Sequence, residues 1–94
     1  MTEKTITKKI PGGKLVRIDL SFEEVITDVK ITGDFFLHPE DVLEKLEKEI
    51  IGLYVPLNKP SLINRLDRVI ENNSAELIGV STIDIVNALT EVTQ

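Results

Sequence analysis

Residues 31–40 read ITGDFFLHPE, and this stretch decides the fold because the spacing of apolar residues changes within it. Before it, apolar and polar residues alternate, which is typical of a half-buried strand. After it, apolar residues recur every three or four positions, which is typical of a helix with one buried face. Pro39, followed by two acidic residues, predicts that this helix begins at Pro39. Two of the three phenylalanines, Phe35 and Phe36, lie between the two patterns.

Three strands are predicted on the N-terminal side of this change, over residues 4–10, 16–22 and 27–35. A turn at Pro11, Gly12 and Gly13 separates the first strand from the second, and a hairpin tip at Glu23-Glu24 separates the second from the third. Such short connections favour an antiparallel meander. In the third strand, the alternation directs one set of side chains toward the core: Thr27, Val29, Ile31, Gly33 and Phe35.

Three amphipathic helices are predicted on the C-terminal side. The first runs from Pro39 to Gly52 and the second from Pro60 to Asn72-Asn73, and the third begins at Ser81, with Asp84 completing a capping box. Residues 75–80 fit either a turn or a short strand. We therefore expect one domain over residues 1–94 of the α+β class, with a three-stranded antiparallel sheet covered by about three helices in two layers.

Composition narrows the classes of function. The chain has 94 residues and no cysteine, which excludes disulfides, a thiolate nucleophile and a thiolate metal site. No apolar run approaches the roughly 20 residues that a membrane helix needs. No apolar segment of the kind found in signal peptides follows Met1. We expect a cytoplasmic protein that does not contact membranes.

Charge is spread unevenly along the chain. Residues 1–17 hold five basic side chains and one acidic, whereas the remaining residues hold six basic and fifteen acidic, within a net charge of −5. A basic N-terminal arm on an acidic body suits an anionic ligand or an acidic partner surface, and it equally suits solvated lysines that protect a sheet edge. Nucleic acid is an unfavourable partner because the body repels phosphates.

Residues for independent catalysis are scarce. His38 is the only histidine, so no cluster of histidines can hold a metal, and the sequence offers no convincing Ser–His–Asp set. The carboxylates of the first predicted helix have the spacing of a solvated face, with lysines between them. We predict no catalytic residue and no metal ligand in this chain.

A basic turn is the first candidate binding site. It comprises Lys9, Gly12, Gly13 and Lys14. Glycines let backbone N–H groups approach a ligand closely, and a phosphate or carboxylate held there would also meet a lysine. The alternative is a plain strand-to-strand turn with charged neighbours.

The second candidate site, for a protein partner, is Gly33, Asp34, Phe35 and Phe36. With a period of two residues, Phe35 faces the core and Phe36 the opposite side, where it could be buried by a partner. The alternative is that the strand ends at Asp34 and both rings pack under the first helix. On these residues alone, the chain is a small α+β interaction module without its own enzymatic activity.

The order of these segments resembles the C-terminal accessory domain of lipoate–protein ligases. The resemblance rests on KIPGGKL at residues 9–15, ITGDFF at 31–36, and His38-Pro39-Glu40 before an acidic amphipathic helix, and it covers about residues 8–90. In single-chain ligases this domain follows a large catalytic domain. Because this chain begins almost directly at the first strand, we expect the small subunit of a bipartite, archaeal-type ligase.

The resemblance implies a heterodimer with a large catalytic subunit that binds lipoate, ATP and Mg²⁺, while this chain binds no cofactor itself. Lipoate and ATP would give lipoyl-AMP and pyrophosphate, and the lipoyl group would pass to a lysine of a lipoyl-domain acceptor protein. No catalytic residue carries over to this chain. The alternative is a free-standing, non-catalytic binding module that regulates another enzyme.

Overall fold

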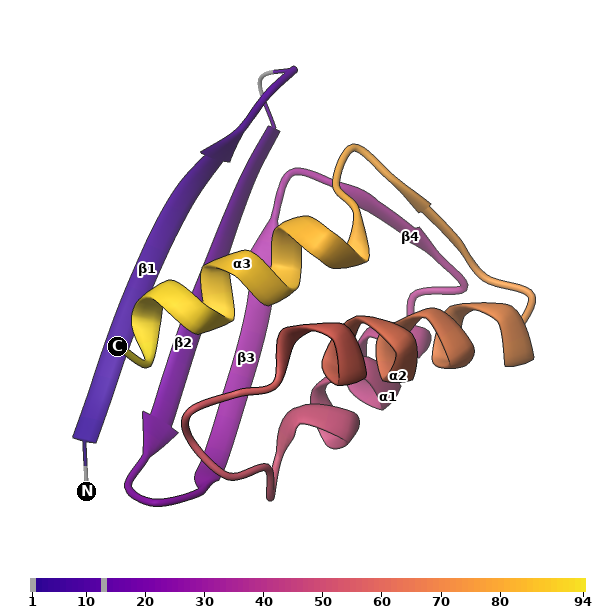
Figure 1. The fold of residues 1–94 in the computed structure, drawn as a ribbon. Coiled ribbons are helices and arrows are strands. Elements are labelled where there is room, and N and C mark those ends of the chain that lie inside the picture. The colour runs from indigo at the N-terminus through magenta and orange to yellow at the C-terminus, as the bar shows by residue number, and fades with distance from the viewer. Residues whose placement is uncertain (1, 13) are drawn as a thin grey trace.

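The computed structural model describes residues 2–12 and 14–94. The first three strands form an antiparallel sheet in chain order, and two later, short strands form a separate ribbon. The elements, in chain order, are β1 (Thr2–Ile10), β2 (Lys14–Phe22), β3 (Ile26–Gly33), β4 (Phe36–His38), α1 (Val42–Ile50), α2 (Lys59–Asn72), β5 (Glu76–Ile78) and α3 (Thr82–Val92) (Figure 1). The predicted α+β class and the three-stranded antiparallel sheet with three helices are confirmed, and the β4–β5 ribbon is an addition.

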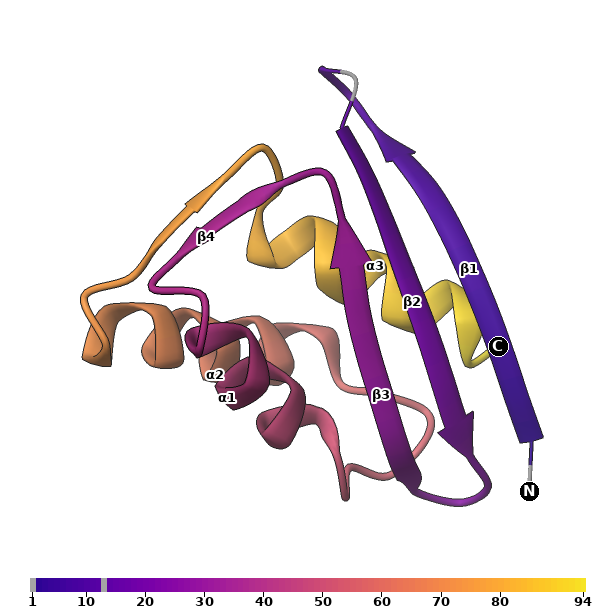
Figure 2. The same ribbon diagram turned by 180° about the vertical axis from the view of Figure 1, so that it is seen from behind.

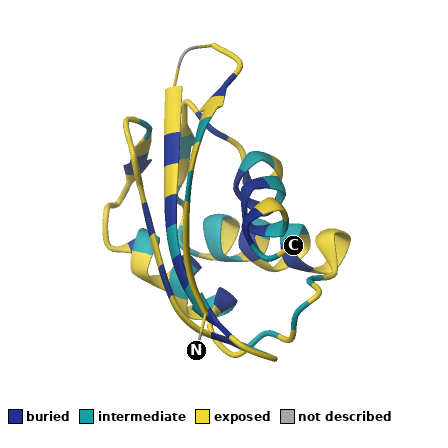
Figure 3. Cartoon of the chain, turned by 90° about the vertical axis from the view of Figure 1, so that its left-hand side faces the viewer, coloured by how far each residue is buried: buried dark blue, intermediate teal, exposed yellow. Residues whose placement is uncertain are grey.

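The core lies between the sheet and the helices. Ile6, Ile18 and Ile31 are direct neighbours across the three strands, and the last two are fully buried. Viewed from behind, the sheet lies in front of α3 (Figure 2), which packs on β1 and β2, while α1 packs on β3. The second helix packs on both of the other helices. Figure 3 shows buried and exposed residues alternating along the strands, as expected for a sheet covered on one face.

The second and third helices begin close to where the sequence predicts, and a capping side chain lies at the start of each. The Asn58 side chain accepts the Ser61 N–H at 3.0 Å and so caps α2. Ser81 and Asp84 form the predicted capping box at α3, with bonds of 3.1 and 3.0 Å between each side chain and the other residue's backbone N–H. Residues 76–78, within the segment that fitted a turn or a strand, form β5.

The predicted third strand is wrong in extent and partly wrong in orientation. It ends at Gly33 instead of continuing to Phe35. A shift of register between Ser21 and Phe22 pairs Phe22 with Ile26, so that Ile26 is buried and Thr27 is exposed. Such a bulge adds one residue to a strand and reverses the alternation beyond it.

The first helix begins three residues later than predicted. Helix α1 begins at Val42, and residues 39–41 form a turn in which the Val42 N–H donates to the Pro39 carbonyl and the Leu43 N–H to the Glu40 carbonyl, each at 3.1 Å. These bonds span three residues, whereas α-helical bonds span four, so the proline begins a tight turn before the helix. His38 belongs to β4 and is exposed.

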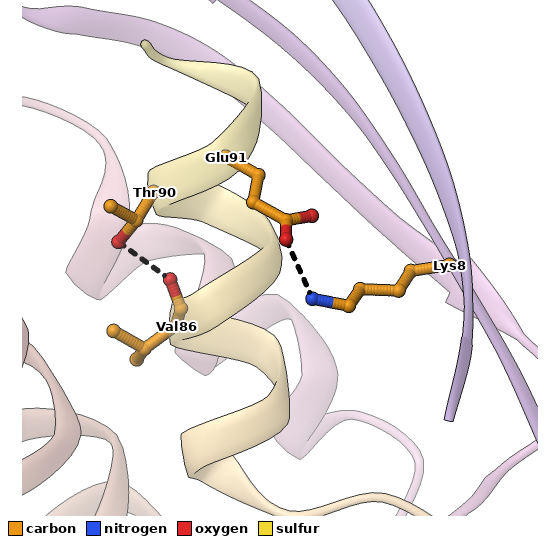
Figure 4. Close-up of polar contacts among 4 residues, drawn as sticks. All are labelled: Lys8, Val86, Thr90 and Glu91. Atoms are coloured by element: carbon orange, nitrogen blue, oxygen red, sulfur yellow. Dashed lines mark hydrogen bonds and ion pairs between the residues drawn. The ribbon is translucent and has the colours of Figure 1, made fainter. Parts of the chain in front are cut away.

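Part of the basic N-terminal arm binds the last helix. Lys8 Nζ lies 2.9 Å from Glu91 Oε1 on α3 (Figure 4), and Lys4 Nζ donates to the Gln94 carbonyl at 3.2 Å. Figure 4 also shows the Thr90 hydroxyl donating to the Val86 carbonyl within α3, at 2.9 Å. These two lysines connect β1 to α3 and to the residue at the end of the chain.

We expect Lys8→Ala to lower the free energy of unfolding by less than about 1 kcal/mol, because exposed ion pairs are screened by water. The side chains of Lys8 and Glu91 are 34% and 50% exposed. A double-mutant cycle with Glu91→Gln, measured by urea unfolding at low and high salt, isolates the coupling, which should fall as salt rises. A coupling above about 2 kcal/mol that is insensitive to salt would contradict this prediction.

Candidate functional site

Residues 9–15 and 31–36, the segments that carry the family resemblance, meet at a tight backbone junction between β2 and the end of β3. The Leu15 N–H donates to Asp34 Oδ1 at 2.5 Å, and the Asp34 N–H donates back to the Leu15 carbonyl at 3.2 Å. At Gly33, a Cβ atom would lie 2.2 Å from the Leu15 carbonyl oxygen, so this approach requires glycine. Leu15 and Asp34, which are 19 positions apart in the sequence, are therefore two sides of one structural contact.

The two phenylalanines take different environments. Phe35 is half-buried and packs against the core, whereas Phe36 is 72% exposed. This matches the first of the two alternatives, with one ring inward and one outward, although Phe36 belongs to β4 and β3 has already ended. Gly33 and Asp34 shape the junction, and Phe36 is the member of this segment that is free to contact a partner.

The members of the basic turn lie on different faces of the β1–β2 hairpin. Lys9 pairs with Leu15 on the face that the helices leave open, whereas Lys14 pairs with Ile10 on the helix side. The Lys14 stem passes over Gly79, where an added Cβ would lie 3.1 Å from Lys14 Cγ. Gly12 has a φ of +106°, and the predicted site residue Gly13 lies outside the described residues.

Ile78 is a neighbour of Phe36 that sequence reasoning missed. In the β4–β5 ribbon, Phe36 pairs with Ile78, which is 54% exposed. The next pair, Leu37 and Leu77, packs against the core. Each strand of the ribbon has three residues, which is too few for alternation to be recognised. Because β4 was not predicted as a separate strand, its pairing with β5 was not predicted either.

A groove of 670 Å³ adjoins this ribbon. Its apolar lining includes Ile31 at the end of β3, Phe35 and Phe36, and Leu43 on α1. Three acidic residues from the start of α1 and the turn before it also line the groove: Glu40, Asp41 and Glu44. None of its described lining residues is lysine, arginine or histidine.

The charged groups were compared for clustering and for shifts in pKa. Within residues 2–12 and 14–94, no three histidine, aspartate or glutamate side chains gather in a way that could hold a metal ion. The pKa of Asp19 is lowered because its carboxylate accepts hydrogen bonds from Thr5 and Arg17, on the open face of the sheet. No helix in the described part of the chain has the length and apolarity to cross a bilayer.

Comparison with known proteins identifies the family of this chain. Residues 3–89 match the family described as "Bacterial lipoate protein ligase C-terminus". "Lipoate-protein ligase A subunit 2" of Thermoplasma acidophilum is 33% identical over 76 residues, which cover 80% of this chain and 76% of that protein.

A solved structure from the same organism, described as a bipartite lipoate protein ligase and its E2 lipoyl domain, has a similar fold. Its matching chain has a TM-score of 0.63 and 27% identity, over 94% of this chain and 97% of that one. With residues 3–89 covered by the family match, the chain belongs to the family of lipoate–protein ligase C-terminal domains.

Proposed function

We propose that this chain is the small accessory subunit of a bipartite lipoate–protein ligase and works with a separate catalytic subunit. The observation that carries the proposal is the family match over residues 3–89. Two further findings support it. One relative is named as subunit 2 of a lipoate–protein ligase, and the match to the bipartite ligase structure covers 97% of the matching chain. We expect the complex to act in the cytoplasm and residues 1–94 to form one domain.

In the proposed reaction, a carboxylate oxygen of lipoate attacks the α-phosphorus of ATP and pyrophosphate leaves. The lysine amine of a lipoyl-domain protein then attacks the acyl carbonyl of lipoyl-AMP, and AMP leaves. Lipoate, ATP and Mg²⁺ are proposed to bind the catalytic subunit. This chain contributes no reacting group, and its proposed role is to complete or close the site in which pyrophosphate is released.

The turn formed by Lys9, Gly12, Gly13 and Lys14 is the part of the chain that we propose lies nearest to the nucleotide phosphates. Lys14 is the main candidate because its stem is placed over Gly79, next to Ile78 and the exposed ribbon. A lysine held there would stabilise the negative charge that develops on the phosphate oxygens. Gly33, Asp34, Phe35 and Phe36 are proposed to form or support the nearby contact with the partner.

Pyrophosphate release from lipoate and ATP tests the proposed function. We expect release with this chain and a bipartite catalytic subunit together, and at most a small fraction of that rate with either protein alone. Size-exclusion chromatography should show the two proteins co-eluting. Equal release with and without this chain, in the absence of co-elution, would refute the accessory-subunit role.

Lys14 can be tested within that assay. We expect Lys14→Gln to reduce adenylation at least tenfold while co-elution is kept, because the lost charge acts on phosphate and not on assembly. Lys14→Arg should retain much of the rate. Lys30→Gln, at an exposed lysine on the open face of the sheet, is the matched control and should have little effect. If Lys14→Gln adenylates normally in an assembled complex, Lys14 is a surface charge only.

A further inference from the structure

We infer that Phe36, Ile78 and the adjoining acidic groove form the docking site for one segment of the catalytic subunit, which carries an apolar side chain and at least one lysine or arginine. This inference rests on the proposed function for its partner. It goes further by assigning the surface, adding Ile78 to it, and stating the chemistry of the segment that it binds.

The apolar part of the surface is the outer face of the β4–β5 ribbon. Phe36 and Ile78 are a direct cross-strand pair and remain 72% and 54% exposed. The neighbouring pair, Leu37 and Leu77, already packs against the core, so the ribbon is apolar on both faces at this point. Adjacent large apolar side chains exposed to water are the kind of contact that dominates binding energy in protein interfaces.

The groove continues this surface, because Phe36 is also one of its walls. Apolar side chains of β3, of the segment after it and of α1 line its interior, and Glu40, Asp41 and Glu44 provide its charged lining. At 670 Å³, it is large enough for a few side chains of a partner segment. An apolar side chain in the groove with a cation against the carboxylates would complement both parts.

Charge argues for a different protein over a second copy of this chain. In a symmetric dimer through this surface, the acidic residues of both copies would be brought together. If the groove instead bound the basic turn of another copy, the contact would be heterologous and would generate rings or open-ended filaments of this chain. A basic segment of the catalytic subunit would neutralise the carboxylates, and the complex would end at one copy of each protein.

The position of Lys14 links docking to activity. Its stem lies against Gly79, the residue after Ile78, so the apolar pair and this lysine are neighbours. Docking at Phe36 and Ile78 would therefore bring Lys14 to the edge of the partner, where the proposed function needs it.

The apolar pair is tested with Phe36→Ser and Ile78→Ser in the full chain, by calorimetric titration against the catalytic subunit. Each variant should raise Kd at least tenfold. Tyr54→Ser and Ile51→Ser are matched controls, with side chains 74% and 41% exposed in the connector between α1 and α2, and each should change Kd less than threefold. Far-UV circular dichroism and urea unfolding confirm that each variant is folded.

The acidic groove is tested with Glu40→Lys combined with Glu44→Lys, and Glu24→Lys combined with Glu71→Lys serves as the control at exposed positions elsewhere. The groove variant should weaken binding more than the control, and raising salt should narrow the difference. If the two pairs weaken binding equally, the basic character assigned to the partner segment is wrong.

The outcomes separate the inference from the proposed function. If the unaltered chain does not bind the catalytic subunit, the proposed function fails. If it binds and the Phe36 and Ile78 variants bind as tightly as their controls, the docking site is wrong although the function stands. The inference would also be overturned if the Phe36 and Ile78 variants bound the lipoyl-domain acceptor more weakly but bound the catalytic subunit as tightly as the unaltered chain.

Discussion

Replacing Gly33 by alanine is expected to lower the free energy of unfolding by about 3 kcal/mol, a large part of the roughly 5–10 kcal/mol that a domain of this size has. The added Cβ would lie 2.2 Å from the Leu15 carbonyl oxygen, a backbone atom that cannot rotate away. Relief of the clash must separate β2 from the end of β3. That movement breaks the two hydrogen bonds between Leu15 and Asp34.

Gly52→Ala is the control for this prediction. Gly52 has a φ of +92°, but an added Cβ there meets no atom within 4 Å. We expect only the conformational cost of a left-handed residue, about 1–2 kcal/mol. Amide hydrogen exchange distinguishes the two: the Leu15 N–H should lose protection in Gly33→Ala and keep it in Gly52→Ala. Unchanged protection of Leu15 in both variants would show that the junction tolerates a side chain.

Leu66→Ala is also expected to cost about 3 kcal/mol, because truncating a buried leucine removes apolar contacts and leaves a cavity. Leu66 is fully buried on α2, the helix that packs between α1 and α3. A cavity at this position weakens the packing of two helices at once. Urea unfolding followed by circular dichroism should show a lower midpoint with an unchanged m-value.

Leu15→Ala is the matched substitution at an exposed position, since its side chain is 42% exposed. It should cost less than about 1 kcal/mol. The backbone bonds of Leu15 to Asp34 do not depend on its side chain, so the junction should persist. Similar losses in the two leucine variants would contradict the placement of Leu66 in the core.

The relation between the two family segments has a structural explanation. The glycine and aspartate of Gly33-Asp34 hold the backbone of Leu15, so these residue types are needed for the fold whatever the partner does. The Phe36 side chain has no comparable role in the fold, because most of it is exposed to solvent. This separates residues that shape the candidate site from residues available to act in it.

Sequence alone determined the elements whose cause is local. Alternation specified β1 and β2, and the periodicity and capping residues specified α2 and α3, because both depend on residues within a few positions of one another. The same reasoning proposed the two candidate segments, and one of its two alternatives for the phenylalanines placed Phe36 outward, where the structure has it. It misplaced the start of α1 because a proline begins a turn as readily as a helix.

Tertiary structure decided the rest. The bulge at Thr27, opposite Ser21 and Phe22, and the end of β3 at Gly33 depend on pairing with β2. The position of Ile78 beside Phe36, and that of Lys14 over Gly79, depend on how segments far apart in the chain pack together. Lys14, Phe36, Ile78 and the acidic residues of the groove come from separate segments, and only folding brings these segments close together.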